Sequence, residues 1–285
     1  MQINAVIIGA QKCATTSLSH YLAQHPEVCL PKIVSRNGAP HPLESDARNG
    51  STADNWEIVD AASYNGQKIV LQKAPQFMYE PKYASIIAAH NPEMKIIAVL
   101  RNQADRAFAH WRHNVRKGRE ARGFVEALAH EPKRIRRNAY FRRHFSYLDR
   151  GHYATQLDRF AEHFREENML VFSFEQFVGE PQESYNRALT FLGLRHSRLD
   201  STTRFNENIY ELRSQALAWP FYALNFIMTE QSVKLHRLRM RLHGRLNLRR
   251  STVRQQINPD LKQTITAEFS AENAHLAERW GVDIS

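Results

Sequence analysis

One stretch near the start of the chain, residues 5–22, most constrains what this sequence can fold into. It begins with four apolar residues that end at Gly9, continues as a short polar loop, and then repeats apolar residues with helical spacing at Leu18, Tyr21 and Leu22. A short apolar run that ends at glycine is typical of a buried strand, and the later spacing is typical of one face of a helix. The stretch therefore predicts a strand, a loop and a helix.

The loop combines one cation with hydroxyl groups placed where the helix should begin. Lys12 is the cation, and Thr15, Thr16 and Ser17 follow at the expected helix start. Backbone N–H groups at a helix N-terminus favour anions, and hydroxyl-bearing residues are good helix caps. We interpret the loop as a phosphate-binding site. An ordinary strand-to-helix turn with a well-capped helix would have the same local chemistry, so this alternative stays open.

Strands and helices alternate along most of the chain. Expected strands cover 3–8, 28–30, 68–72, 95–100 and 169–174, and expected helices cover 15–24, 81–90, 103–117, 124–130, 153–164 and 181–192. After residue 204 we expect no strand, only helices over 210–228, 232–243 and 259–280. The alternation predicts an α/β fold, a P-loop-like three-layer domain in which helices flank a central parallel sheet, followed by a helical C-terminal region.

The length of the chain, 285 residues, suits one large α/β domain. We predict a single domain over 1–285, with a nucleotide-binding core over 1–204 and a helical part over 205–285. Residues 33–65 are rich in Pro, Gly, Ser and Asn and predict a long loop, of the kind that is usually a functional lid or disordered.

The formal net charge of +10 directs the search for partners to anions: nucleotides, sulfated or phosphorylated substrates, nucleic acid or a membrane surface. The two cysteines, Cys13 and Cys29, form neither a disulfide framework nor a metal-ligand pattern. The first residues do not read as a signal peptide, and the longest apolar stretch, 216–228, is too short to span a bilayer. We expect a reducing, cytoplasmic setting.

The loop differs from a Walker A loop, which requires G-x-x-x-x-G-K-[ST]. After Gly9, Ala14 and Thr15 take the places of the second glycine and the lysine, and the cation has moved to Lys12. The strand over 95–100 is followed by Arg101, where P-loop NTPases have the Asp that holds Mg²⁺. The sequence therefore predicts a phosphate site without metal, in which Lys and Arg supply the neutralising charge.

Four motifs carry a family resemblance. Gln11-Lys12-Cys13-Ala14-Thr15-Thr16-Ser17-Leu18 resembles the 5′-phosphosulfate loop, roughly QK-x-GTT-x-L, of sulfotransferases that use 3′-phosphoadenosine 5′-phosphosulfate (PAPS), in particular the heparan-sulfate-type group and its bacterial relatives. Residues 100–110 are similar to the family's 3′-phosphate segment, LR-x-P-x-x-RA-Y-S-H, and Lys73-Ala74-Pro75 to K-[ST]-P-x-Y. The family's G-x-Y, F-E-x-(L/F) and FLGL motifs have counterparts at 151–153, 174–175 and 191–194. The resemblance covers most of 4–194 and returns near 258–285.

The resemblance implies a metal-free, in-line transfer of a sulfuryl group from PAPS to a hydroxyl or amine of a glycan, lipid or small molecule. Lys12 would contact the 5′-phosphate and the bridging oxygen, and Lys73 would reach the sulfuryl group from a neighbouring strand. Arg101 would pair with the 3′-phosphate through its planar fork. The rest of the donor loop comprises Gln11, Cys13, Ala14, Thr15, Thr16 and Ser17. The alternative is that Lys73 is a solvated lysine at the end of a strand.

Two departures from the family pattern concern the 3′-phosphate and the base. The family's 3′-phosphate serine falls on Ala109 here, and Arg106 is compatible with a structural role. The family's Glu falls on Ser35, so His41 and Glu44 are our candidates for the general base. Both are equally compatible with a place on the surface of the loop.

Two basic tracts leave their partners open. The tract over 112–150 interleaves aromatics with cations, which fits nucleic acid, a solvated helix face or an anionic glycan or lipid headgroup. The stretch over 216–254, apolar and then basic, fits a peripheral contact with an anionic membrane, but we favour a core helix followed by an exposed one. The resemblance places Arg249 and Arg250 in a basic loop that closes over the 3′-phosphate and adenine.

A sulfotransferase is the leading interpretation, and no nucleic-acid partner is expected for it. Two other classes stay open. A small-molecule kinase with an unusual P-loop is disfavoured by the missing glycine, lysine and Asp. An anion-binding module for nucleic acid or membrane that has lost catalysis is compatible with Ala109 and with the absent Glu.

Overall fold

The computed structural model describes residues 2–31, 64–201, 210–228, 233–251 and 255–284. Contacts group the chain into two compact units, which we describe separately. Unit 1 comprises Met1–Asn102, His152–Phe205 and Thr266–Ser285, and unit 2 comprises Gln103–Gly151 and Asn206–Ile265. The single domain over 1–285 stays a prediction.

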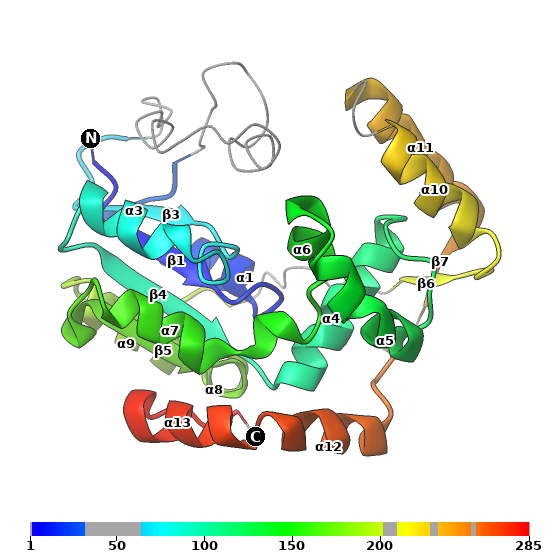
Figure 1. Ribbon diagram of the computed structural model, residues 1–285. Helices are drawn as coiled ribbons and strands as arrows, with labels where there is room; N and C mark the ends of the chain where they lie inside the picture. The colour runs from blue at the N-terminus through cyan, green and yellow to red at the C-terminus, as the bar shows by residue number, and fades with distance from the viewer. Residues whose placement is uncertain (1, 32–63, 202–209, 229–232, 252–254, 285) are drawn as a thin grey trace. The chain divides into compact units, whose positions relative to one another are not determined.

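Unit 1 is built on a parallel sheet of five strands in the order β2-β3-β1-β4-β5 (Figure 1). The strands are β1 (Ala5–Gly9), β2 (Val28–Cys29), β3 (Ile69–Lys73), β4 (Lys95–Leu100) and β5 (Met169–Ser173). Each strand pairs in parallel with its neighbours, for example Val6 with Ile96 and Ile97 with Leu170. The predicted central parallel sheet is confirmed, with strand bounds that differ by at most two residues.

Helices cover both faces of this sheet. Between β1 and β2 the chain passes through α1 toward one edge of the sheet. Between β3 and β4 it passes through α3 toward the other edge. Because such crossovers are right-handed, α1 and α3 lie on opposite faces. Helices α8 and α9 pack with α1, and α7 packs with α3 and α13. Their bounds are α1 Thr15–Leu22, α3 Lys82–His90, α7 Tyr153–Ala161, α8 Phe174–Gly179, α9 Pro181–Phe191 and α13 Ser270–Trp280.

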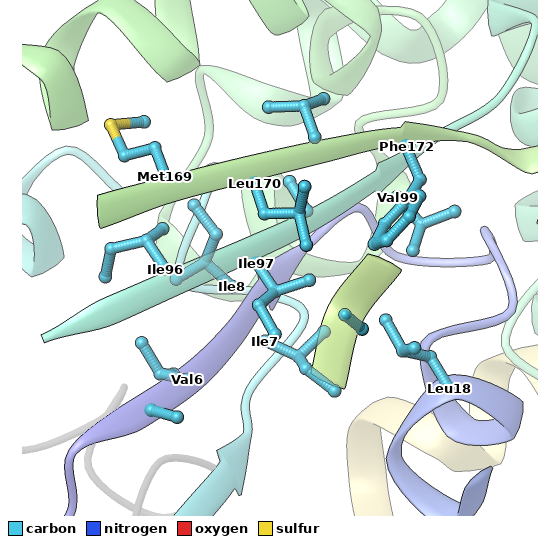
Figure 2. Close-up of a cluster of buried hydrophobic side chains, with 14 of the residues drawn as sticks. Val6, Ile7, Ile8, Leu18, Ile96, Ile97, Val99, Met169, Leu170 and Phe172 are labelled. Atoms are coloured by element: carbon cyan, nitrogen blue, oxygen red, sulfur yellow. The ribbon is translucent and has the colours of Figure 1, made fainter. Parts of the chain in front are cut away.

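The core of unit 1 lies along the three central strands. Figure 2 shows aliphatic side chains of β1, β4 and β5 packed against one another and near Leu18 of α1. The side chains of Ile7, Ile97 and Val99 are fully buried. Strands covered on both faces are apolar at consecutive positions, which is why these segments were readable from the sequence. The core fixes the carboxyl ends of β1, β3 and β4, where the candidate site residues follow.

Unit 2 is mostly helical but contains two strands that the sequence did not predict. β6 (Tyr210–Leu212) and β7 (Leu248–Arg250) pair antiparallel, with Glu211 opposite Arg249. The prediction of helices alone after residue 204 is therefore wrong. A ladder of three residues is too short to show an alternating pattern, and each strand adjoins a helical segment that dominates the local periodicity. The helices are α4 Gln103–Arg116, α5 Phe124–Ile135, α6 Ala139–Phe145, α10 Ala218–Met228 and α11 Val233–Asn247.

Other differences concern helix boundaries. The helix expected over 259–280 is two helices, α12 (Pro259–Glu268) and α13, separated at Phe269. The helix expected from residue 210 begins only at Ala218, because β6 comes first. The helix α6 was not predicted, although Asn138 caps it by accepting a hydrogen bond from the Phe141 N–H at 3.1 Å.

Part of the basic tract over 112–150 serves the interior of unit 2. The Arg134 guanidinium pairs with the buried Glu120 carboxylate at 3.1 Å, and the Tyr147 hydroxyl donates to the same carboxylate at 2.9 Å. Phe141 and Phe145, two more of the tract's aromatics, are buried as well. These rings are packed inside the protein and are not exposed platforms for bases. Among the described residues, no helix combines the length and hydropathy needed to cross a membrane.

Candidate functional site

The loop between β1 and α1 is a tightly turned backbone segment. The Ala10 N–H donates to the Val99 carbonyl at 2.8 Å, which ties the start of the loop to β4. Lys12 and Ala14 have φ angles of 76° and 57°, in the left-handed region that non-glycine residues rarely adopt. Such strain persists where the surroundings hold it, and it is concentrated at functional sites.

The first turn of α1 leaves backbone donors for a ligand. The N-cap residue is Ala14, with no side-chain cap, so the expectation that the hydroxyl residues cap the helix is wrong. The Leu18 N–H donates to the Ala14 carbonyl, but the N–H groups of Thr15, Thr16 and Ser17 have no acceptor among the residues that the structure describes. Uncapped N–H groups at a helix start are a site for an anion.

Gly9, at the end of β1, allows a close approach by the segment after β3. The Ala74 N–H donates to the Ile7 carbonyl at 2.9 Å, and the Met78 N–H donates to the Ile8 carbonyl at 3.0 Å. A Cβ atom at Gly9 would lie 2.7 Å from Met78 Cβ. These contacts hold the predicted lysine-containing motif against the loop.

Lys73, the last residue of β3, lies beside the phosphate loop. In the sheet it pairs with Ile7, and its Nζ donates to the Thr16 hydroxyl at 3.2 Å. Burial lowers the pKa of the Lys73 ammonium from its ordinary value. Lysine and hydroxyl come from positions 57 residues apart, so the structure brings together two predicted site residues. Of the two readings of Lys73, a site residue and a solvated lysine, the contact favours the first.

Arg101 follows β4 and is held by two other motifs of the resemblance. Its guanidinium lies 4.5 Å from the centre of the Phe174 ring, and the Tyr153 hydroxyl donates to its backbone carbonyl at 3.1 Å. Its Nε is buried without a hydrogen-bond partner among the described residues. The sequence motifs at 151–153 and 174–175 had no assigned role, and both turn out to position Arg101. The sequence signal that could have identified Phe174 is an aromatic residue directly after a buried strand.

The remaining predicted residues have separate places. Arg106, in α4, is fully buried and donates to the Tyr147 carbonyl, which is the structural role considered for it. Arg249 and Arg250 lie in strand β7, so their placement in a loop is wrong; both are exposed, and Arg249 Nε lies 2.9 Å from Glu211 Oε1. His41 and Glu44 lie outside the described residues. The binding and catalytic roles of Arg249, Arg250, His41 and Glu44 stay predictions.

The comparison with known protein families decides the class. A model of the family "Sulfotransferase domain" matches residues 2–218. The chain belongs to the sulfotransferase domain family. The matched range contains the β1–α1 loop, Lys73, Arg101 and Phe174, so the predicted family is confirmed for the part of the chain that carries the site.

Individual relatives agree with this assignment. The sulfotransferase is 27% identical over 203 residues to heparan sulfate glucosamine 3-O-sulfotransferase 3B1 of Mus musculus, which covers 71% of this chain and 49% of that protein. It is 24% identical over 207 residues to the bifunctional heparan sulfate N-deacetylase/N-sulfotransferase 1 of Caenorhabditis briggsae, over 70% of this chain and 24% of that protein. The chain thus spans at most about half the length of these two curated relatives.

A solved structure extends the likeness to almost the whole chain. The crystal structure of a sulfotransferase from Alicyclobacillus acidocaldarius matches with a TM-score of 0.68 and 25% identity, over 99% of this sulfotransferase and 97% of that chain. The fold predicted from the sequence is therefore confirmed as a sulfotransferase fold. None of these relatives supports the kinase or the non-enzymatic module.

Proposed function

We propose that this sulfotransferase transfers a sulfuryl group from PAPS to a hydroxyl or amine acceptor, without a metal ion. The observation that carries the proposal is the contact of Lys73 with Thr16 at the uncapped start of α1. This arrangement combines backbone donors, a hydroxyl and an ammonium around one position, which is the set of groups that stabilises negative charge on phosphate and sulfuryl oxygens.

The described residues fit the charges of the nucleotide. PAPS, when bound, supplies a sulfuryl group on a phosphate leaving group. The N–H groups of Thr15, Thr16 and Ser17 would donate to the 5′-phosphate, and Lys12 and Lys73 would neutralise the charge that develops on the leaving and sulfuryl oxygens. Arg101, whose Nε lacks a partner among the described residues, would hold the 3′-phosphate through its fork. Arg249 and Arg250 are proposed to add charge at the nucleotide.

Metal-free transfer is supported by the end of β4. The residue that follows this strand is Arg101, a fixed cation, where a metal-dependent P-loop enzyme needs a carboxylate. Cations from side chains then take the part that Mg²⁺ plays in phosphoryl transfer. Measuring nucleotide binding in the presence of a chelator tests this directly.

The acceptor must lose a proton as it attacks, and His41 or Glu44 is the proposed base. A histidine is poised near neutral pH, whereas a glutamate needs burial to be as basic. The curated relatives are named for heparan sulfate, and the one from Mus musculus for its glucosamine, which supports a glycan with an amino sugar as the first acceptor to test. Lipid and small-molecule hydroxyls are further acceptors to test.

The decisive experiment is transfer of radiolabelled sulfate from PAPS across a panel of glycans, lipids and small molecules. We expect transfer to at least one class, and tight binding of 3′-phosphoadenosine 5′-phosphate by isothermal titration in EDTA. Lys12→Ala should abolish transfer, whereas Lys82→Ala, an exposed lysine of α3, should leave it unchanged. His41→Asn and Glu44→Gln should separate the two candidate bases. Absence of nucleotide binding in EDTA would contradict the proposal.

A further inference from the structure

Helix α11 has an unusual arrangement, because polar side chains occupy its buried positions. The Arg239 guanidinium donates to the Gly118 carbonyl at 3.1 Å and to the Phe221 carbonyl at 3.2 Å. The His243 Nε2 lies 2.9 Å from the Val115 carbonyl, and Asn247 Oδ1 accepts from the Ser214 N–H at 3.0 Å. The residues Arg239, His243 and Asn247 are spaced four apart and are buried. Hydrogen bonds thus hold one face of the helix to the rest of unit 2.

The exposed side of the same helix carries leucines. Leu235, Leu238, Leu242 and Leu246, which we call the leucine face, are spaced three or four apart and are between 39% and 57% exposed. This spacing places all four on one side of a helix. A helix that buries its polar residues and exposes its leucines is inverted relative to an ordinary surface helix. The sequence-based interpretation was an exposed helix here, and this face is exposed, but it carries leucines rather than basic residues.

Apolar exposure is concentrated in this part of the molecule. Among the described residues, seven of the nine large hydrophobic side chains with high exposure fall within residues 217–246. They include Leu217, directly before α10, and Trp219 in the first turn of α10, which packs beside α11 (Figure 1). Scattered exposed leucines need no explanation, but a clustered apolar face marks an interaction surface.

Positive charge borders one side of the leucine face. With about 3.6 residues per turn, the buried residues of α11 border the leucine face on one side, and the exposed Arg241 and Arg245 border it on the other. The sequence over 231–254 has eight Lys and Arg and no acidic residue. Glu211 pairs with Arg249 at the end of the helix, in the β6–β7 ladder. The exposed face is thus apolar with a cationic border.

We propose that the leucine face of α11 docks on the surface of an anionic lipid bilayer. The leucines would enter the boundary between headgroups and acyl chains, and Arg241 and Arg245 would contact the phosphates. A second copy of this chain is a poorer occupant, because two identical cationic borders would repel each other across the interface. The inference is independent of the proposed function, since it requires neither donor nor acceptor.

Vesicle flotation of the full chain tests the proposal. We compare vesicles of phosphatidylcholine alone with vesicles that contain about 30% phosphatidylserine, at about 0.1 M and about 0.5 M salt. The wild type should float with the anionic vesicles, less so at high salt. Leu238→Gln with Leu242→Gln, and separately Arg241→Gln with Arg245→Gln, should each weaken partitioning by about tenfold. Val125→Gln with Val178→Gln, which changes two exposed valines elsewhere in the described part of the chain, is the matched control and should bind as the wild type does.

Three results would overturn the proposal: no flotation of the wild type with anionic vesicles, flotation unchanged by both sets of substitutions, or flotation lost equally in the valine control. Sedimentation velocity can give a fourth result that would overturn the proposal. A wild-type dimer that the leucine variant converts to monomer, without any vesicle binding, would assign the face to a second copy. Because the arginine variant keeps every leucine, it tests the proposal even if the leucine variant folds poorly.

Discussion

The Lys73 ammonium donates to the Thr16 hydroxyl at 3.2 Å, linking the end of β3 to the first turn of α1. The contact places a cation at the uncapped helix start, where three backbone N–H groups have no acceptor among the described residues. The cost of holding the ammonium partly out of water is visible in its lowered pKa, which burial causes. A partly desolvated cation is poised to interact strongly with an anion that arrives between it and the helix.

Replacing Lys73 should therefore reduce the rate of transfer more than it reduces nucleotide binding. We expect Lys73→Met to lower kcat by about 10²-fold or more, the usual effect of removing one preorganised charge donor from a transition state. The affinity for 3′-phosphoadenosine 5′-phosphate, which has no sulfuryl group, should change less than tenfold. Steady-state kinetics with PAPS and titration with the product measure the two effects separately.

Two further variants, Lys82→Met and Lys73→Arg, serve as controls for Lys73→Met. Lys82 is exposed on α3 and should tolerate the change. In the wild type, kcat/KM should fall on the alkaline side with an apparent pKa below that of an ordinary lysine, because Lys73 loses its proton there. Lys73→Arg should move this fall to higher pH. A weaker product affinity in Lys73→Met with kcat unchanged would instead assign the residue to uniform binding.

Phe174 should control the affinity for the 3′-phosphate through Arg101. The ring lies under the guanidinium at 4.5 Å, so Phe174→Leu removes the platform and leaves the charge. We expect a five- to tenfold weaker affinity for 3′-phosphoadenosine 5′-phosphate, about 1 kcal/mol, the range of a partly desolvated cation–π contact. Titration with adenosine 5′-phosphate, which lacks the 3′-phosphate, should show the same affinity in both proteins. A parallel loss for both nucleotides would show that Phe174 acts on the fold.

The sequence predicted those parts of the site that follow directly from buried strands. Lys73 and Arg101 end or follow apolar runs, and the carboxyl ends of parallel strands meet at one edge, so their motifs could be placed. The stack of Phe174 on Arg101 joins residues 73 positions apart, and no local pattern encodes it. Ala14 as a left-handed N-cap has no signal either, because alanine is neither a usual cap nor a usual left-handed residue.

The same limit explains the errors in unit 2. Glu211 and Arg249 face each other in a ladder whose strands lie on either side of a helical pair, and three residues per strand give no periodic signal. The inverted pattern of helix α11 was not predicted, because buried arginine and exposed leucine reverse the usual preference. There, carbonyl groups of Gly118 and Phe221 satisfy the Arg239 guanidinium, and only the tertiary structure supplies them.

Glu131 should make unit 2 less stable as the pH rises. Burial raises the pKa of this carboxyl from 4.5 to about 7, although the N–H groups of Asp149 and Leu148 oppose the shift. The folded state therefore binds the proton more tightly than the unfolded state does. The contribution of Glu131 to the free energy of unfolding is complete below pH 4.5. It falls by about 3 kcal/mol as the pH rises to about 7, at about 1.4 kcal/mol per pH unit.

Denaturant unfolding at pH values from 4 to 8 (about one unit apart) measures this loss as the difference between wild type and Glu131→Gln. The amide keeps an acceptor for the Leu148 and Asp149 N–H groups and cannot ionise, so the variant should gain stability relative to the wild type as the pH rises. Glu126→Gln, an exposed residue of the same helix, should follow the wild-type curve. Parallel curves for wild type and Glu131→Gln would contradict the prediction.

Gly9 should be intolerant of even a methyl group. Its added Cβ would lie 2.7 Å from Met78 Cβ and 2.6 Å from Met78 Sδ, and the Met78 N–H is bonded to the Ile8 carbonyl, so the backbone there cannot move away freely. We expect Gly9→Ala to lower the free energy of unfolding by about 1–3 kcal/mol, the usual cost of overpacking. Because the displaced segment carries Lys73, the affinity for 3′-phosphoadenosine 5′-phosphate should fall as well.

Gly179→Ala is the matched comparison for Gly9→Ala. Gly179 ends α8, and an added Cβ there meets nothing within 4 Å, so the change should be neutral or stabilise the protein by up to about 1 kcal/mol through helix propensity. Thermal and denaturant unfolding of the two variants, with nucleotide titration, separate steric contact from a general effect of losing glycine. If both variants unfold as the wild type does, Met78 yields without cost. The close packing of this segment against β1 would then not be what positions Lys73.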